Sequence, residues 1–113
     1  MTVRRGEIWW VELDPAVGSE LRKKRPCVVV QRDAANAVSP TTIICPLTSA
    51  IGKKLGPANV PLHPGEAGLK KPSLVLCNQV RVVDVRRLSA RVGTIGAETL
   101  GKVERGLRAI LDL

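Results

Sequence analysis

The stretch Cys27-Val28-Val29-Val30-Gln31 is apolar at its first four positions and β-branched at three of them. A run with no polar residue at alternating positions is typical of a strand that is covered on both faces. We therefore predict a central, buried strand over residues 27–31. The surrounding apolar runs are also short and are separated by proline, glycine and charge, which favours a β-rich domain over a helical bundle.

A first strand is predicted on the N-terminal side, from Glu7 to Leu13. Because side chains alternate along a strand, one face carries Trp9, Val11 and Leu13, and the other carries Ile8 and Trp10. Asp14-Pro15 and Gly18 then break the chain into a loop that lasts to about Lys24.

The C-terminal side continues as short elements. They are a helical turn at Asp33 to Val38, a strand at Thr41 to Cys45, a short strand at Asn59 to Leu62, a long strand at Ser73 to Val82, a helical turn at Asp84 to Leu88 and a last strand at Ala90 to Val92. Pro46 has no N–H to donate, so we expect regular pairing to stop there. Residues 48–57 and 64–72 are expected to be loops, the first of them basic and exposed.

One long helix is predicted, from Ala97 to Asp112. Its apolar residues recur at helical spacing: Leu100, Val103, Leu107, Ile110 and Leu111. Glu98 with Lys102 and Glu104 with Arg108 are expected to pair one turn apart. Gly101 and Gly106 disfavour a helix interior, so close packing against the sheet or a partner chain is expected to retain them. The 113 residues are expected to form a single, mainly β domain of the α+β type.

The formal net charge of +8 points to a polyanionic partner, and a symmetric dimer would double this charge. Nucleic acid is the leading class, because the cations are grouped within predicted loops. The groups are Arg22 to Arg25, Lys53-Lys54, Lys70-Lys71 and Arg86-Arg87.

Cys27, Cys45 and Cys77 each lie inside an apolar run and are interpreted as buried thiols of a reducing compartment. A zinc site that adds His63 is disfavoured, because no Cys-x-x-Cys pair is present. The first residues are charged and resemble no signal peptide, and no window approaches a membrane span, so a cytoplasmic location is expected.

The acidic residues are few and scattered, which disfavours a two-metal nuclease site. RNA offers a route without a metal or other cofactor, because its own 2′-OH attacks the adjacent phosphate once it is positioned. Such an enzyme has to orient the strand, donate to the phosphate oxygens and move two protons.

A set of ordered blocks then carries a family resemblance. The blocks are Arg5-Gly6-Glu7-Ile8-Trp9-Trp10, Leu13-Asp14-Pro15, Gly18-Ser19-Glu20, Lys24-Arg25-Pro26, Val28-Val29-Val30, Cys45-Pro46-Leu47-Thr48-Ser49, Asn78-Gln79-Val80-Arg81-Val82-Val83-Asp84 and Arg87-Leu88. In this order the sequence resembles the MazF/PemK toxin endoribonucleases of type II toxin–antitoxin systems. The resemblance implies an SH3-like barrel with a C-terminal helix, a homodimer and metal-independent cleavage of single-stranded mRNA at a short preferred sequence. It also implies 2′,3′-cyclic phosphate and 5′-hydroxyl ends, inhibited translation and growth, and a separately encoded, acidic MazE-like antitoxin.

By position, Arg25 and Thr48 match the family's catalytic residues. Because an arginine stays protonated, we interpret Arg25 as a stabiliser of phosphate charge and Glu20 as the candidate base. The alternatives are a strand-flanking surface charge for Arg25, a turn hydroxyl for Thr48 and a salt bridge to the basic loop for Glu20. The expected RNA-binding residues are Ser19, Arg22, Lys23, Lys24, Ser49, Lys53, Lys54, Asn78, Gln79 and Arg81.

Residues 21–24 read Leu-Arg-Lys-Lys where the family often has Gln and Gly, so the family's cleavage motif is not transferred to this chain. Trp9 and Trp10 are the only aromatics for base stacking, and core packing is expected for at least one. Two other functions stay open. One is a gyrase-poisoning toxin of the same fold that acts through its C-terminal helix, and the other is a basic RNA- or DNA-binding barrel without catalysis.

Overall fold

The computed structural model describes residues 2–15, 17–20, 23–49, 56 and 58–113. Within them the strands are β1 (Glu7–Glu12), β2 (Lys24–Val29), β3 (Thr41–Thr48), β4 (Asn59–Pro61), β5 (Leu74–Leu76), β6 (Arg81–Asp84) and β7 (Leu88–Thr94). The helices are α1 (Asp33–Asn36) and α2 (Ala97–Leu111), with 3₁₀ turns η1 (Glu66–Gly68), η2 (Cys77–Gln79) and η3 (Val85–Arg87). None of the helices in this part of the chain is long and apolar enough to cross a membrane.

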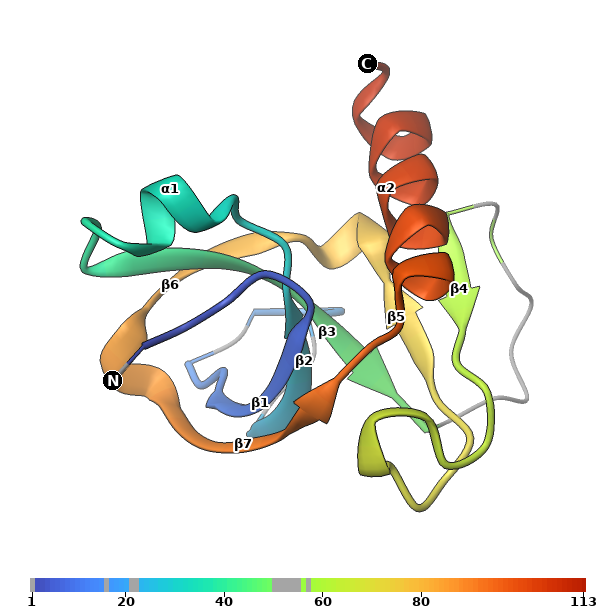
Figure 1. The fold of residues 1–113 in the computed structure, drawn as a ribbon, viewed down its shortest axis with the longest axis horizontal. Coiled ribbons are helices and arrows are strands. Elements are labelled where there is room, and N and C mark those ends of the chain that lie inside the picture. Colours follow the sequence, from blue (N-terminus) through green and yellow to red (C-terminus); the bar gives the residue numbers. More distant parts are fainter. Residues whose placement is uncertain (1, 16, 21–22, 50–55, 57) are drawn as a thin grey trace.

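The strands form one antiparallel sheet in the order β4-β5-β3-β2-β1-β7, with β6 also paired to β3. The sheet coils on itself, and α2 stands beside β4 and β5 at one end (Figure 1). The prediction of a mainly β, barrel-like fold with a C-terminal helix is confirmed.

The central strand β2 is buried on both of its faces. Val28 packs with Ile8 and Cys45 in a core that Val103 of α2 completes. Its neighbours Cys27 and Val29 belong to a second core. The remaining buried members of that core are Val3, Trp9, Val11, Leu13, Ile44, Val83 and Leu88. The predicted central strand is confirmed, although it starts at Lys24 and ends at Val29. All three cysteines are buried and free, as expected.

The prediction that pairing ends at Pro46 is wrong, because β3 continues to Thr48 and Pro46 lies opposite Cys27 of β2. A proline removes only its own donor, and the residues on either side keep theirs. The predicted basic loop therefore starts after Thr48, and most of it lies outside the described residues.

The single long strand predicted over residues 73–82 is also wrong. Two short strands, β5 and β6, pair in turn with the same edge of β3, and the 3₁₀ turn η2 separates them. Val75 lies opposite Leu47, and Arg81 lies opposite Ile44, so the turn falls beside Cys45 and Pro46. Pro46 has no N–H to offer a partner strand at this point.

The C-terminal helix is confirmed, but its contacts differ in part from those expected. Lys102 and Glu98 pair at 3.8 Å as predicted. Glu104 pairs instead with Arg5 of the N-terminal segment, at 2.7 Å. Ile110 and Leu111 were expected on the buried stripe, yet both are about half exposed. The last strand, β7, is also longer than predicted and spans Leu88–Thr94.

Gly106 and Gly101 of α2 give a matched pair of stability tests. A Cβ at Gly106 would lie 2.9 Å from Cys77 Sγ and 3.0 Å from the carbonyl oxygen of Ala58. Gly106→Ala is therefore expected to lower the free energy of unfolding by about 1–3 kcal/mol through overpacking. Among the described residues, a Cβ at Gly101 would meet only the Arg105 guanidinium, at 3.7 Å, so Gly101→Ala is expected to raise the free energy of unfolding by up to ~1 kcal/mol. Urea unfolding measures both, and equal effects of the two substitutions would contradict this packing.

Candidate functional site

Two hollows adjoin along the C-terminal end of β3. The larger is a groove of about 590 Å³. It is lined by Trp10, Lys23, Lys24, Arg25, Pro26, Leu47, Thr48, Ser49, Gly68, Leu69, Lys70, Lys71, Ser73 and Val92. The smaller is a pocket of about 210 Å³ lined by Leu13, Glu20, Pro46, Asn78, Gln79, Val80 and Arg81. Pro46 lines the pocket, and the next two residues of β3, Leu47 and Thr48, line the groove. The pocket and the groove therefore lie next to each other along this strand.

Strand pairing brings Arg25 and Thr48 together. Cys27 of β2 lies opposite Pro46 of β3 in an antiparallel register. The pairing ends there, and its register extended by two residues on each strand would align Arg25 with Thr48; both residues line the groove. Directly opposed residues of antiparallel strands point to the same face, with Cβ atoms about 4.5–5.5 Å apart. The two side chains therefore start from one face of the sheet, the face of Cys27 and Pro46.

Two cations act on that face. Burial raises the pKa of the Cys27 thiol to about 12, while the nearby positive charges of Arg81 and Arg25 oppose this rise. The strand pairing agrees for Arg81, which lies opposite Ile44, a member of the same core as Cys27. An anion placed beside Arg25 and Thr48 is favoured by both positive charges.

Hydrogen bonds between the two ends of the loop that joins β1 to β2 fix the start of β2. The Lys23 N–H donates to the Asp14 carboxylate at 2.9 Å, and the Lys23 carbonyl accepts from the Leu13 N–H at 2.8 Å. The Arg87 guanidinium donates to the carbonyl oxygens of Asp14, at 2.6 Å, and of Glu12, at 3.1 Å. These bonds hold Lys23 and the following cations at the rim of the groove.

Glu20 lies in the pocket. Its Oε1 accepts the Val17 N–H at 2.9 Å, while its own N–H donates to the Val17 carbonyl at 3.2 Å. Across the pocket, the Arg81 guanidinium reaches the Leu13 carbonyl at 3.4 Å. The described contacts of the Glu20 carboxylate are thus with its own loop, and Asn78, Gln79 and Arg81 line the same pocket.

The other predicted residues are distributed over these two hollows and the adjoining loop. Lys23, Lys24 and Ser49 line the groove, whereas Asn78, Gln79 and Arg81 line the pocket. Ser19 is exposed beside Glu20. Arg22, Lys53 and Lys54 lie outside the described residues. In the part of the chain that the structure describes, no three His, Cys, Asp or Glu side chains are grouped to hold a metal ion.

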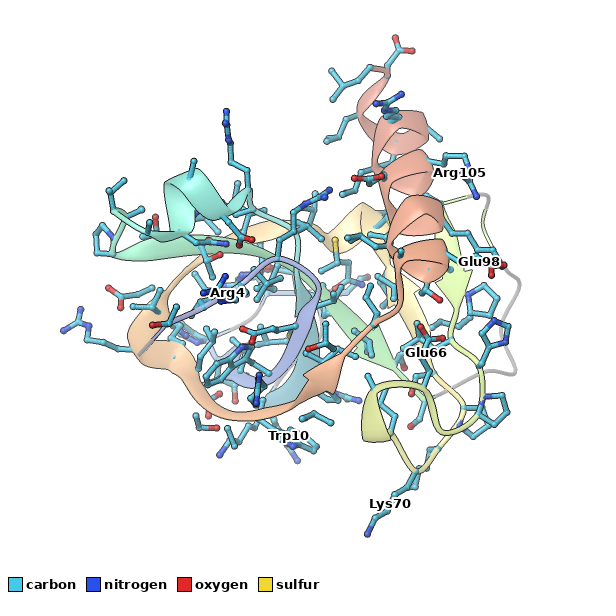
Figure 2. The ribbon with its side chains drawn as sticks, viewed as in Figure 1. Arg4, Trp10, Glu66, Lys70, Glu98 and Arg105 are labelled. Carbon is cyan, nitrogen blue, oxygen red and sulfur yellow. The ribbon has the colours of Figure 1, made fainter. Side chains whose placement is uncertain are left out.

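The structure adds a groove wall that was not predicted. Lys70 and Lys71 follow η1 and line the same groove as Trp10. Figure 2 shows Trp10 and Lys70 on the same side of the molecule, away from α2. The two tryptophans differ: Trp9 is 8% exposed and donates its Nε1–H to Glu7 at 3.1 Å, whereas Trp10 is 39% exposed. The basic pair was visible in the sequence, but its position beside β1 depends on contacts between distant segments.

One of those contacts is made by the carboxylate of Glu66. It accepts the N–H of His63 at 3.2 Å and of Gly96 at 3.3 Å. Gly93 supplies a second contact, because a Cβ there would clash with the carbonyl of Ala67. The segment that carries Lys70 is thereby fixed against the end of β7.

Residues 4–111 match the family described as the PemK-like, MazF-like toxin of type II toxin–antitoxin systems. The chain belongs to this family. It is similar to Endoribonuclease EndoA of Bacillus subtilis (strain 168), with 34% identity over 113 residues, covering all of this chain and 97% of that one.

Solved structures of the MazF family agree with the fold. MazF of Deinococcus radiodurans (Form-I) superposes with a TM-score of 0.82 at 27% identity, over 100% of this chain and 99% of that one. The MazE–MazF structure (Form-II) from the same organism gives a TM-score of 0.77 at 25% identity, over 100% and 98% of the two chains.

The Glu66 contacts predict how stability depends on pH. Burial raises the pKa of this carboxyl, but hydrogen bonds from Thr99, His63 and Gly96 outweigh it and leave the pKa below the ordinary 4.5. A depressed pKa in the folded state contributes stability above pH 4.5, and the contribution is lost as the pH falls through the folded value. Glu66→Gln is expected to lower the free energy of unfolding at pH 7 and to flatten its loss between pH 5 and 3. Urea titrations at several pH values test this, and parallel wild-type and variant curves would contradict it.

Proposed function

We propose that this MazF-like chain is an endoribonuclease toxin that cleaves single-stranded RNA, with the scissile phosphate held between Arg25 and Thr48. The proposal rests on one observation: Arg25, near the start of β2, and Thr48, at the end of β3, line the same lysine-rich groove. The endoribonuclease EndoA, which is similar over the whole chain, supports the reaction class.

The proposed reaction uses the 2′-OH of the RNA as nucleophile. Its oxygen bonds to the adjacent phosphorus as the bond to the 5′-oxygen breaks, which leaves a 2′,3′-cyclic phosphate and a 5′-hydroxyl. Arg25 supplies a planar fork of N–H donors to the phosphate oxygens as negative charge develops on them. The Thr48 hydroxyl donates beside it. Donors fixed before the reaction stabilise the transition state without rearranging.

We assign the proton acceptor to Glu20. Strand alternation puts the side chains of Arg25 and Thr48 on the face of Pro46, and Pro46 lines the same pocket as Glu20. The carboxylate thus lies on the side of the sheet where the phosphate would be bound. Asn78 and Gln79, whose amides offer both donors and acceptors to base edges, line that pocket too and are proposed to contribute to cleavage at a preferred sequence.

The proposed partners follow from charge and from the relatives. With a net charge of +8, the chain favours an acidic segment that competes with RNA for the groove. The MazF of D. radiodurans has been solved together with MazE, which supports a cognate MazE-like antitoxin here. We also propose a homodimer that acts in the cytoplasm.

Removal of the phosphate contacts tests the proposal directly. Arg25→Ala is expected to lower the single-turnover cleavage rate of an unstructured RNA at least 100-fold, and Thr48→Val roughly 10- to 100-fold, because each removes a donor to the developing charge. The measurement uses a labelled RNA of mixed sequence in EDTA, with analysis of the new ends. Arg105→Ala, an exposed cation on α2, is the matched control and is expected to leave the rate unchanged.

Three results would reject the proposal. They are absence of RNA cleavage by the wild-type chain, cleavage that requires added metal, and near-normal cleavage by a folded Arg25→Ala variant. Inhibition of gyrase supercoiling with intact RNA would favour the gyrase-poisoning alternative.

A further inference from the structure

Trp10 is an aromatic ring that the fold leaves accessible inside a cationic groove. Its neighbour Trp9 is buried with a hydrogen-bonded indole, whereas Trp10 stays 39% exposed and lines the groove together with Leu69 and Val92. On β1 it lies opposite Pro26 of β2, the residue next to Arg25. Because side chains alternate along a strand, the ring starts from the face of Pro26 and the Arg25 side chain from the opposite face. Trp10, Arg25 and Thr48 nevertheless all line the same groove at the strand ends.

Cations flank this ring from two separate segments. Lys23 and Lys24 approach from the start of β2, and Lys70 and Lys71 approach from the segment after η1. Both segments are fixed: the first by the Asp14 carboxylate, the second by the Glu66 carboxylate. The fold therefore holds lysines from two separate segments in the same groove as Trp10 and its apolar neighbours.

We infer that Trp10, Lys70 and Lys71 form a subsite for an unpaired nucleotide next to the scissile phosphate, its base stacked on Trp10 and its outer phosphate bound by the lysines. This inference rests on the proposed RNA cleavage and adds a binding residue to it. Single-stranded nucleic acid alternates flat apolar bases with anionic phosphates, and proteins bind it with aromatic rings beside cations. The groove volume of about 590 Å³ lies within the usual range for ligand sites.

The subsite selects for single strands. A base in a duplex is stacked on its neighbours and paired, so it cannot place its face on a protein ring. An acidic peptide would also be attracted to the lysines, but it has no need of the exposed ring. Single-stranded RNA is thus the occupant that uses both features of the groove.

Binding to a strand that cannot be cleaved tests the subsite apart from the chemistry. The probe is a fluorescently labelled oligonucleotide of mixed sequence with 2′-O-methyl groups throughout, and Kd is measured by anisotropy. Trp10→Leu is expected to raise Kd roughly 5- to 150-fold, the equivalent of about 1–3 kcal/mol for one stacked base. Trp10→Phe is expected to retain most of the affinity. An abasic oligonucleotide of the same length is expected to bind the wild type and Trp10→Leu equally.

The contribution of Lys70 and Lys71 is measured separately, through the salt dependence of Kd. Lys70→Gln and Lys71→Gln are each expected to reduce the slope of log Kd against log salt concentration, by up to about 0.7 for each lost phosphate contact. Lys102→Gln on α2 is the charge-matched control and is expected to leave the slope unchanged. Thermal unfolding of each variant verifies that it is folded.

Equal affinity of folded Trp10→Leu for the base-containing strand would overturn the subsite. Equal loss of binding to the intact and abasic strands by folded Trp10→Leu, with the same loss in folded Trp10→Phe, would also overturn it. Binding of a polyglutamate peptide that depends on Trp10, without such dependence for RNA, would assign the groove to a protein partner. A wild type that binds the probe but cleaves no RNA would reject the proposed function and not the binding site.

Discussion

The antiparallel pairing of β2 with β3 is the interaction on which the rest of the molecule depends. Val28 opposite Cys45 contributes to one core, and Cys27 and Val29 contribute to the other. The same pairing brings the start of β2, with Arg25, and the end of β3, with Thr48, to one groove. A slip of one residue would turn every side chain of β2 to the other face, so the hydrophobic cores specify the geometry of the site.

Around this strand pair the fold holds several lysines close together, although their positive charges repel one another. The two lysine-bearing segments are held in place by acceptors that lie elsewhere in the chain, the carboxylates of Asp14 and Glu66. Cations held close together by such bonds repel one another, and an anionic strand in the groove relieves this repulsion. RNA binding and the stability of these loops are thus linked, because a ligand that binds only the folded state stabilises it.

The elements with a clear local pattern could be predicted from sequence, namely β1, β2 and α2. The predictions failed where pairing between distant segments determines the structure. β3 continues through Pro46 because other segments supply its partner strands on both sides. The predicted long strand is divided into β5 and β6 by the turn η2. At the site, the family resemblance pointed to Arg25 and Thr48, and the pairing of β2 with β3 explains how two residues so far apart in sequence come to line one groove. The Lys70–Lys71 wall escaped prediction because no local signal places it beside Trp10.

A crystal structure with a bound RNA analogue tests the central claim most directly. The ligand is an oligonucleotide that carries a 2′-deoxy sugar at the mapped cleavage position, so that the nucleophile is absent and the strand stays intact. Our account predicts that the scissile phosphate lies between the β2 and β3 ends, within hydrogen-bond distance of the Arg25 guanidinium and the Thr48 hydroxyl. A scissile phosphate bound away from both residues would contradict it.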